Sequence, residues 1–528
     1  MNLSQPAVCL ELLEKLHPTD VERTHGLLVS MVDSLLQAAP APNQHLEVLE
    51  KARELLHFTQ NEISCRYTNR PLPPHSEDNH FLQKVIRLWQ QLSQSYARLA
   101  EHDAGAGNLE DQSALLLQRR LHYATLVPAE YFRARREIPP GCWAEINAAM
   151  RAAMQLKQEN VRVADPLNET WGAQSPLEAF VASLLVELAN PYSRTVQELK
   201  WIMRWAQRFA PYCQLRPLDD SAKAASYGIE LHGDSSLRPL AVLPPTPTVL
   251  RFDGSRLGQQ LEAVLSQIKS GARPASLGLG HDCSTNASTQ LLLALYRPWG
   301  HNTAGRRFPR RHASGMIQLT ANWLGIGFGI SGQVFHQPGS QPGTSHDIKL
   351  LTFGERALEV DTPEQVRNRH QLEARRLGLE FEQWQVIDQS VGGFRIQRQE
   401  LGERLSHHQL IGFRPDDGGN FLLGDLNRLM YYDDGRLEAG IEVLPGLPRM
   451  RAARPAGSEE AGTPYQQVFV FPPSSVLNPV SLIILPLEWF ARQRQISLLV
   501  DNQPSPIRLT RLLRRGANYD YCEFEPAA

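Results

Sequence analysis

The sequence predicts a multidomain α+β protein: an N-terminal all-α helical region, then an antiparallel β-barrel with a helical insertion, then a β-rich C-terminal extension. Apolar residues recur at helical spacing through roughly the first 213 residues. After Gly305, short strand-like runs alternate with turn signals, and one helical segment near Pro363 interrupts them. A length of 528 residues is typical of about three to four domains.

The N-terminal region has the pattern of amphipathic helices. Leu82, Val85 and Trp89 are three and four residues apart and form one apolar stripe. No fixed repeat period is present, so we expect residues 1–240 to form a helical bundle or a helical-repeat-like domain. We expect residues 241–304 to form a helical linker region.

One helix start within this region is marked by its capping residues. Thr195 and Glu198 have the spacing of a capping box, in which each side chain bonds to the backbone N–H of the other residue. A helix carrying Trp201 and Trp205 is therefore predicted to begin directly after Thr195.

The second half of the chain has the pattern of short strands joined by turns. Asp416–Gly419 and Asp433–Gly435 are turn signals between β-rich runs, which favours a closed or nearly closed barrel. We expect a barrel over residues 305–446 and a β-rich extension or second small barrel over residues 447–528. The strand candidates of the two parts are Met316–Leu319, Gln383–Ile387, Phe394–Gln397, Gln409–Phe413, Leu426–Tyr432 and Gly440–Leu444, and then Gln467–Phe471, Ser481–Leu485 and Ile496–Val500.

Two features lie between the first two barrel strands. Thr362 as N-cap, Pro363 at the first helical position and Gly378 as a left-handed C-terminal residue predict a helix. The glycine-rich stretch Gly325–Gly332 lacks the following helix of a dinucleotide-binding loop, so we interpret it as a strand or hairpin.

Composition excludes several classes of protein. A formal net charge of −2 gives no global field that would attract a nucleic acid polymer. The six cysteines are far apart and form no CxxC pair, which indicates a reducing compartment rather than a disulfide or zinc scaffold. No signal segment and no apolar run long enough to span a bilayer is present, so we expect no membrane span and a cytoplasmic location.

Two short motifs carry the candidate chemistry. Guanidinium groups form charge-assisted bonds to phosphates and stack on bases, while a short carboxylate accepts from the N1–H and amine of guanine. Either motif alone is more often a solvated surface run or an ordinary turn, but their order and the strands around them favour a ligand with two phosphates and guanine bases. The candidate ligand-binding residues are Arg306, Arg307, Arg310, Arg311, Asp388, Ser390 and Gly393.

The segment Arg306–Leu444 resembles a PilZ domain, the bacterial receptor module for cyclic di-GMP. That family begins with RxxxR, often with a proline before the second arginine, and continues with D/NxSxxG. This chain has RRFPR from Arg306 and DQSVGG from Asp388, on a turn that we expect to follow the strand ending at Ile387. A second register places RxxxR on Arg307 and Arg311.

The resemblance implies a role for each motif residue. Arg306 and Arg310 would hold phosphate and stack on guanine, Asp388 and Ser390 would read a guanine edge, and Gly393 would leave room for the base. The interval between the motifs departs from the family pattern, since Arg310 and Asp388 are 78 residues apart rather than a few tens. We interpret the excess as an insertion between barrel strands, which leaves open whether the motifs meet.

The resulting hypothesis is a bacterial effector that binds cyclic di-GMP without chemistry or cofactor and relays it to a protein partner through the helical N-terminal region. Motility, pili, adhesion and biofilm control are the outputs that the resemblance implies. The alternative is a nucleotide-independent scaffold with a degenerate barrel. An enzyme is not expected: no carboxylate cluster, metal-ligand spacing or GGDEF- or EAL-like motif is present, and His281–Cys283 lacks an oxyanion motif.

Overall fold

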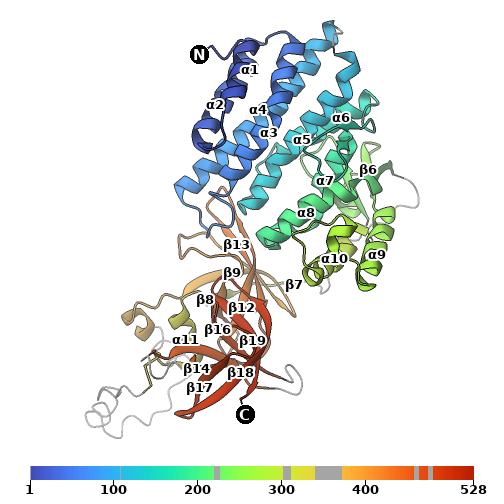
Figure 1. Ribbon diagram of the computed structural model, residues 1–528. Coiled ribbons are helices and arrows are strands. Elements are labelled where there is room, and N and C mark those ends of the chain that lie inside the picture. The colour runs from blue at the N-terminus through green and yellow to red at the C-terminus, as the bar shows by residue number, and fades with distance from the viewer. Residues whose placement is uncertain are drawn as a thin grey trace. The chain divides into compact units, whose positions relative to one another are not determined.

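The chain divides into two compact units. They comprise Met1–Arg70 with Pro74–Arg307, and Pro71–Pro73 with Phe308–Ala528; we call them the helical unit and the barrel unit (Figure 1). Among the described residues, no helix combines the length and apolar content that a bilayer crossing requires. The computed structural model describes residues 2–106, 109–218, 226–300, 311–338, 372–456, 463–473 and 480–527.

The helical unit contains α-helices, a two-stranded sheet of β1 (Val163–Ala164) and β2 (Ala173–Gln174), and one four-stranded sheet. The four-stranded sheet has the strand order β3 (Gln214–Pro217), β6 (Val249–Asp253), β4 (Tyr227–Glu230) and β5 (Arg238–Pro239). The predicted helical N-terminal region is confirmed. The helices are α1 (Pro6–Lys15), α2 (Val21–Ala38), α3 (Pro42–Ser64), α4 (Ser76–Ala106), α5 (Ser113–Arg133), α6 (Cys142–Gln155), α7 (Pro176–Leu188), α8 (Val196–Phe209), α9 (Ser255–Lys269) and α10 (Thr285–Gly300).

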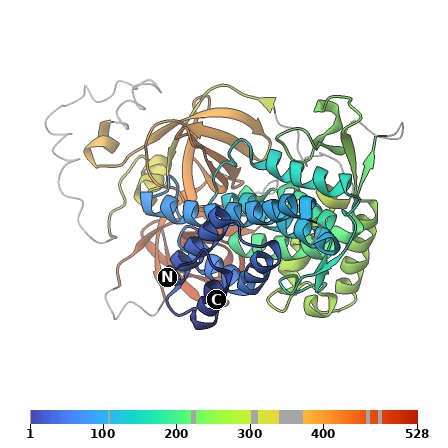
Figure 2. The ribbon, with the colours of Figure 1, turned by 90° about the horizontal axis from the view of Figure 1, so that it is seen from above.

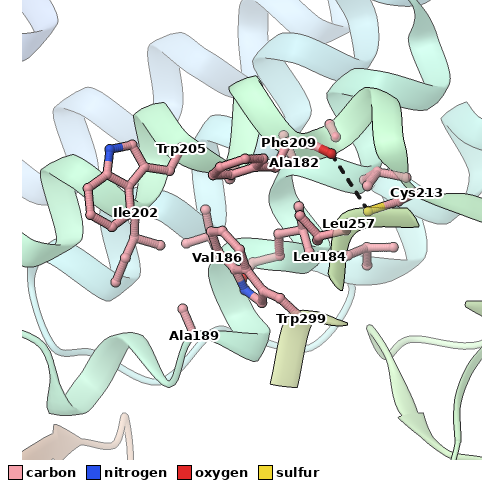
Figure 3. Close-up of a cluster of buried hydrophobic side chains, with 14 of the residues drawn as sticks. Ala182, Leu184, Val186, Ala189, Ile202, Trp205, Phe209, Cys213, Leu257 and Trp299 are labelled. Atoms are coloured by element: carbon pink, nitrogen blue, oxygen red, sulfur yellow. Dashed lines mark hydrogen bonds between the residues drawn. The ribbon is translucent and has the colours of Figure 1, made fainter. Parts of the chain in front are cut away.

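Two hydrophobic clusters form the interior of this unit. One lies among the N-terminal helices, coloured blue in Figure 2, and the other joins α5–α8 to the sheet, α9 and α10. Figure 3 shows Trp205 of α8 and Val186 of α7 in the second cluster, together with Leu257 of α9 and Trp299 of α10. Helices α9 and α10, which lie in the segment 241–304 expected as a linker, therefore contribute to this core.

The start of α8 follows the predicted cap. The backbone N–H of Glu198 donates to the Thr195 hydroxyl at 3.1 Å, and the Glu198 carboxylate accepts from the Thr195 N–H at 2.9 Å. The helix then presents Trp205, whose indole N–H donates to the carbonyl of Leu279 at 2.8 Å. The capping box thus sets the register with which α8 enters the second cluster.

A polar cluster lies between α3 and α5. Arg53 and Asp165, both buried, form an ion pair of 2.9 Å, and the Nε2 atoms of His57 and His122 are 3.0 Å apart. Burial lowers the pKa of both histidines well below the ordinary value, and the positive charge of Arg53 lowers it further. The folded unit therefore holds both imidazoles neutral.

This cluster predicts a loss of stability in acid. Below the ordinary histidine pKa of about 6.5, the unfolded chain binds more protons than the folded unit, so the free energy of unfolding falls as pH falls. The slope approaches about 1.4 kcal/mol per pH unit for each histidine. Denaturant unfolding of His122→Gln between pH 7 and pH 5 should show a shallower pH dependence than the wild type. The exposed His17→Gln should keep the wild-type slope, and equal slopes for all three proteins would contradict the prediction.

The barrel unit contains two closed six-stranded barrels, which confirms the predicted fold class. The ring of the first barrel is β10 (Gly393–Arg398), β13 (Leu437–Val443), β12 (Leu422–Tyr431), β11 (Leu410–Pro415), β8 (Met316–Thr320) and β9 (Glu382–Ser390), and β9 also pairs with β10. The ring of the second barrel is β14 (Arg449–Pro455), β15 (Gln466–Phe471), β16 (Ser481–Pro486), β19 (Tyr519–Pro526), β18 (Gln503–Arg515) and β17 (Gln495–Val500).

A short helix joins the two barrels where the sequence suggested a strand or hairpin. Our interpretation of the glycine-rich stretch was wrong, because Trp323–Ser331 forms helix α11. A Cβ atom on Gly329 would lie 2.7 Å from the ring of Phe421, and one on Gly327 would lie 2.2 Å from the side chain of Gln467. The glycines therefore let the helix approach both barrels closely, which explains them without a nucleotide.

The predicted insertion helix is described only at its end. Its first residues, 363–371, lie outside the described residues. Residues 372–376 are helical, Gly378 has φ +67°, and the N–H of Leu379 donates to the carbonyl of Ala374 at 2.9 Å. This is the left-handed helix end that the sequence predicts at Gly378.

Candidate functional site

The end of the arginine motif lies beside the DxSxxG motif. Arg311 and His312 form strand β7, which pairs with β9 so that Arg311 is opposite Gln389 and His312 is opposite Asp388. Arg311 is exposed, and the described part of the chain gives it no ion pair. The other arginines of the motif, Arg306, Arg307 and Arg310, lie outside the described residues.

The second motif lies within a strand rather than after one. We expected the strand to end at Ile387 and the motif to form a turn, but β9 continues to Ser390 and includes Asp388. Gly393 opens β10 and is paired with Ser390. The turn is therefore confined to the two residues between them, and Asp388 is held by strand pairing.

A β-bulge at Ile387 aims Asp388 away from the barrel interior. Val386 is opposite Ile396, and Asp388 is opposite Arg395, so Ile387 has no partner in the ladder. Val386 and Ile396 belong to the core of the first barrel. Because neighbouring residues on β10 point to opposite faces, Arg395 and its partner Asp388 point outward.

Two rows of outward residues cross neighbouring strands at this point, one over four strands and the other over five. We call this surface the outer face. Cross-strand pairing defines both rows, and neighbouring strands are about 4.8 Å apart. The first row is Ser390, Gly393, Glu442 and Asp425, and the second is His312, Asp388, Arg395, Gly440 and Arg428.

Ion pairs run along the outer face. The Arg395 Nε donates to Asp388 Oδ2 at 2.7 Å, and Arg395 lies 3.8 Å from Glu438. Glu438 in turn lies 3.4 Å from Arg428 and accepts from the hydroxyl of Tyr432 at 3.1 Å. Sequence reasoning missed Arg395; its position two residues after Gly393 on the same strand was the available signal.

The glycine of the motif is required by the fold. A Cβ atom on Gly393 would lie 1.9 Å from the carbonyl oxygen of Ile441 on the neighbouring strand, whereas one on Gly392 would meet nothing within 4 Å. The Ser390 hydroxyl donates to the Gly393 carbonyl at 3.4 Å, at the long limit of a hydrogen bond. Close strand approach thus accounts for Gly393 independently of any ligand.

A cavity beside the first barrel lies at the other end of β9. It has a volume of 530 Å³ and is lined by Gln318, Ala374, Arg375 and the run Gly378–Gln383. None of the motif residues that the structure describes lines it. Among the described residues, no group of three or more histidine, cysteine or acidic side chains is placed to hold a metal ion. The described side chains of the outer face form hydrogen bonds and ion pairs.

Comparison with known families gives the class of the protein. Residues 7–220 match the model described as "Cyclic-di-GMP receptor FimW, N-terminal domain". Together with the two-barrel fold, this match defines a cyclic di-GMP receptor.

The family follows from a second match at the other end of the chain. Residues 451–527 match the FimW C-terminal β-barrel domain, and the two matches together cover more than half of the chain. The chain therefore belongs to the FimW family. The first barrel, which carries both motifs, lies between the two matched segments. None of the curated proteins compared with the chain matches it.

The glycine pair of the motif provides a test of the local packing. Gly393→Ala should lower the free energy of unfolding of the barrel unit by at least about 2 kcal/mol, because the new Cβ atom would clash with the Ile441 carbonyl and push β10 away from β13. Gly392→Ala is the matched control and should change it by less than about 0.5 kcal/mol. Denaturant unfolding measures both variants. Equal loss in the two would show that the close approach at Gly393 is not a constraint.

Proposed function

We propose that the first barrel is a PilZ-like domain and that it binds cyclic di-GMP on the outer face. The Asp388 carboxylate would accept hydrogen bonds from one guanine, and the Ser390 hydroxyl would donate a hydrogen bond to it. Arg306 and Arg310 would bind phosphate and stack on the base. Arg307 and Arg311 would add positive charge. The protein would act as a bacterial effector that binds its ligand without catalysing a reaction.

The pairing of β7 with β9 is the observation that supports this proposal most strongly. It places Arg311 across from the Asp388 motif although the two are 77 residues apart in sequence. Arg310 directly precedes Arg311 in the chain, so the Cα atoms of the two residues are about 3.8 Å apart. Arg306 is five residues before Arg311, which allows a separation of at most roughly 18 Å.

The position of the motif in the chain supports a relay. The boundary between the helical unit and the barrel unit falls at Arg307–Phe308, inside the arginine motif. A ligand that fixes these arginines would act on the segment that joins the two units. We propose that this changes how the helical unit binds a protein partner, with motility, pili, adhesion or biofilm formation as the controlled process.

Titration calorimetry tests the site. The wild-type chain should bind cyclic di-GMP, and Arg310→Ala should bind it on the order of a hundredfold more weakly, because charge-assisted contacts to phosphate are lost. Arg508→Ala is the control, since Arg508 forms an exposed ion pair with Glu525 in the second barrel. Equal affinity of Arg310→Ala and wild type would exclude the site, and no binding by the wild type would favour the scaffold alternative.

The relay has its own test. A partner captured by the full-length chain should be retained differently with and without cyclic di-GMP, because the ligand is proposed to change the helical unit. Arg310→Ala should remove that difference while still capturing the partner. Equal retention by the wild type in both conditions, measured by quantitative co-purification, would contradict the relay.

A further inference from the structure

The second barrel contributes a charged side chain to the edge of the outer face. Arg514, on β18, lies 2.9 Å from Glu442 Oε1 and 3.2 Å from Asp425 Oδ2. Glu442 is directly opposite Gly393 on one side and opposite Asp425 on the other. The guanidinium of the second barrel is thus one strand away from the DxSxxG motif.

A bulge in β18 directs this arginine. Leu512 is paired with Cys522 and Arg514 with Tyr521, so Leu513 is extra in the ladder. Leu512 packs against the core of the second barrel, whereas Leu513 packs against the hydrophobic cluster shared by the two barrels. The extra residue therefore places Arg514 on the side of β18 that contacts the first barrel.

The acceptor of this contact is a fully buried carboxylate. Asp425 has 0% exposed surface, and besides its ion pair with Arg514 it accepts from the Tyr519 hydroxyl at 2.8 Å. Its other oxygen lies 2.7 Å from His408 Nδ1. Asp425 thus keeps two partners if Arg514 is removed.

Glu442 depends more heavily on the arginine. Its side chain is 41% exposed, and Arg514 is the cation that the structure places against it. Burial of Arg514 disfavours its charged form, but the carboxylates of Glu442 and Asp425 more than offset this and raise its pKa. The arginine therefore stays charged, and it lies against two like charges that face each other across neighbouring strands and offsets their repulsion.

We propose that Arg514 is a positioning residue of the receptor site, which neutralises Glu442 so that a doubly charged anion can bind beside it. Without Arg514, the Glu442 carboxylate would be an unpaired negative charge next to Gly393, where the ligand phosphates would be repelled. The second barrel thus completes the electrostatics of a site carried by the first. This inference rests on the proposed binding of cyclic di-GMP to the outer face.

A double-mutant cycle at Arg514 and Glu442 tests the inference by calorimetry with cyclic di-GMP. Arg514→Gln should bind roughly fivefold or more weakly at low salt, and the difference should shrink as salt screens the charge. Glu442→Gln alone should bind at least as tightly as the wild type. The double variant should return to within about twofold of the wild type, because the repelling carboxylate is gone.

A control on the same strand separates this effect from a general change of charge. Arg511 forms an exposed ion pair of 3.6 Å with Glu523, so Arg511→Gln should leave the affinity unchanged. Thermal unfolding of each variant checks that the barrels remain folded. If Arg514→Gln does not fold, the affinity of Glu442→Gln for cyclic di-GMP still tests the inference. Weaker binding by Glu442→Gln than by the wild type would contradict the proposed repulsion.

The outcomes distinguish the two proposals. Wild-type affinity in Arg514→Gln, or a double variant as weak as Arg514→Gln, would overturn the role of Arg514 and leave the site on the outer face intact. A wild-type chain that does not bind cyclic di-GMP would overturn the proposed function and this inference with it.

Discussion

The antiparallel pairing of β8 and β7 with β9 is the constraint on which the outer face depends. Ile317 is opposite Trp384 in the core of the barrel, and β7 pairs with the end of β9, where His312 is opposite Asp388 after a shift of one residue in the register. The hydrophobic core fixes this register, because a slip of one residue would turn Trp384 out of the interior. β8 and β9 pair directly although a long insertion separates them in sequence, so two segments far apart in the chain meet at one edge.

β-Bulges in the barrel strands determine the direction in which particular side chains point. The extra residue Ile387 turns Asp388 outward while Val386 stays in the core, and the extra residue Leu513 turns Arg514 toward the first barrel. Each bulge lies in a strand that also has residues packed in the core of its barrel. Arg395 shows the benefit of this arrangement, since its charge-assisted bond to Asp388 orients the carboxylate before any ligand arrives.

Local signals in the sequence were sufficient for some of the elements and insufficient for the site. The capping box at Thr195 and the left-handed Gly378 were predicted correctly, because each depends on a few neighbouring residues. The glycine-rich segment at Gly325 was misinterpreted, because its glycines serve contacts with Phe421 and Gln467, which are distant in sequence. Asp388 and Ser390 were predicted from a motif and remain a prediction, whereas Arg395 and Arg514 reach the outer face through cross-strand register, which no local pattern encodes.

The central claim is that cyclic di-GMP binds where β7 meets β9. Hydrogen–deuterium exchange of the full chain with and without the ligand tests it most directly, because bound ligand should slow exchange of backbone amides beneath it. The account predicts slower exchange in residues 306–312 and 388–393, with little change in residues 374–383 around the large cavity. Slower exchange confined to that cavity or to the helical unit, with residues 388–393 unchanged, would contradict it.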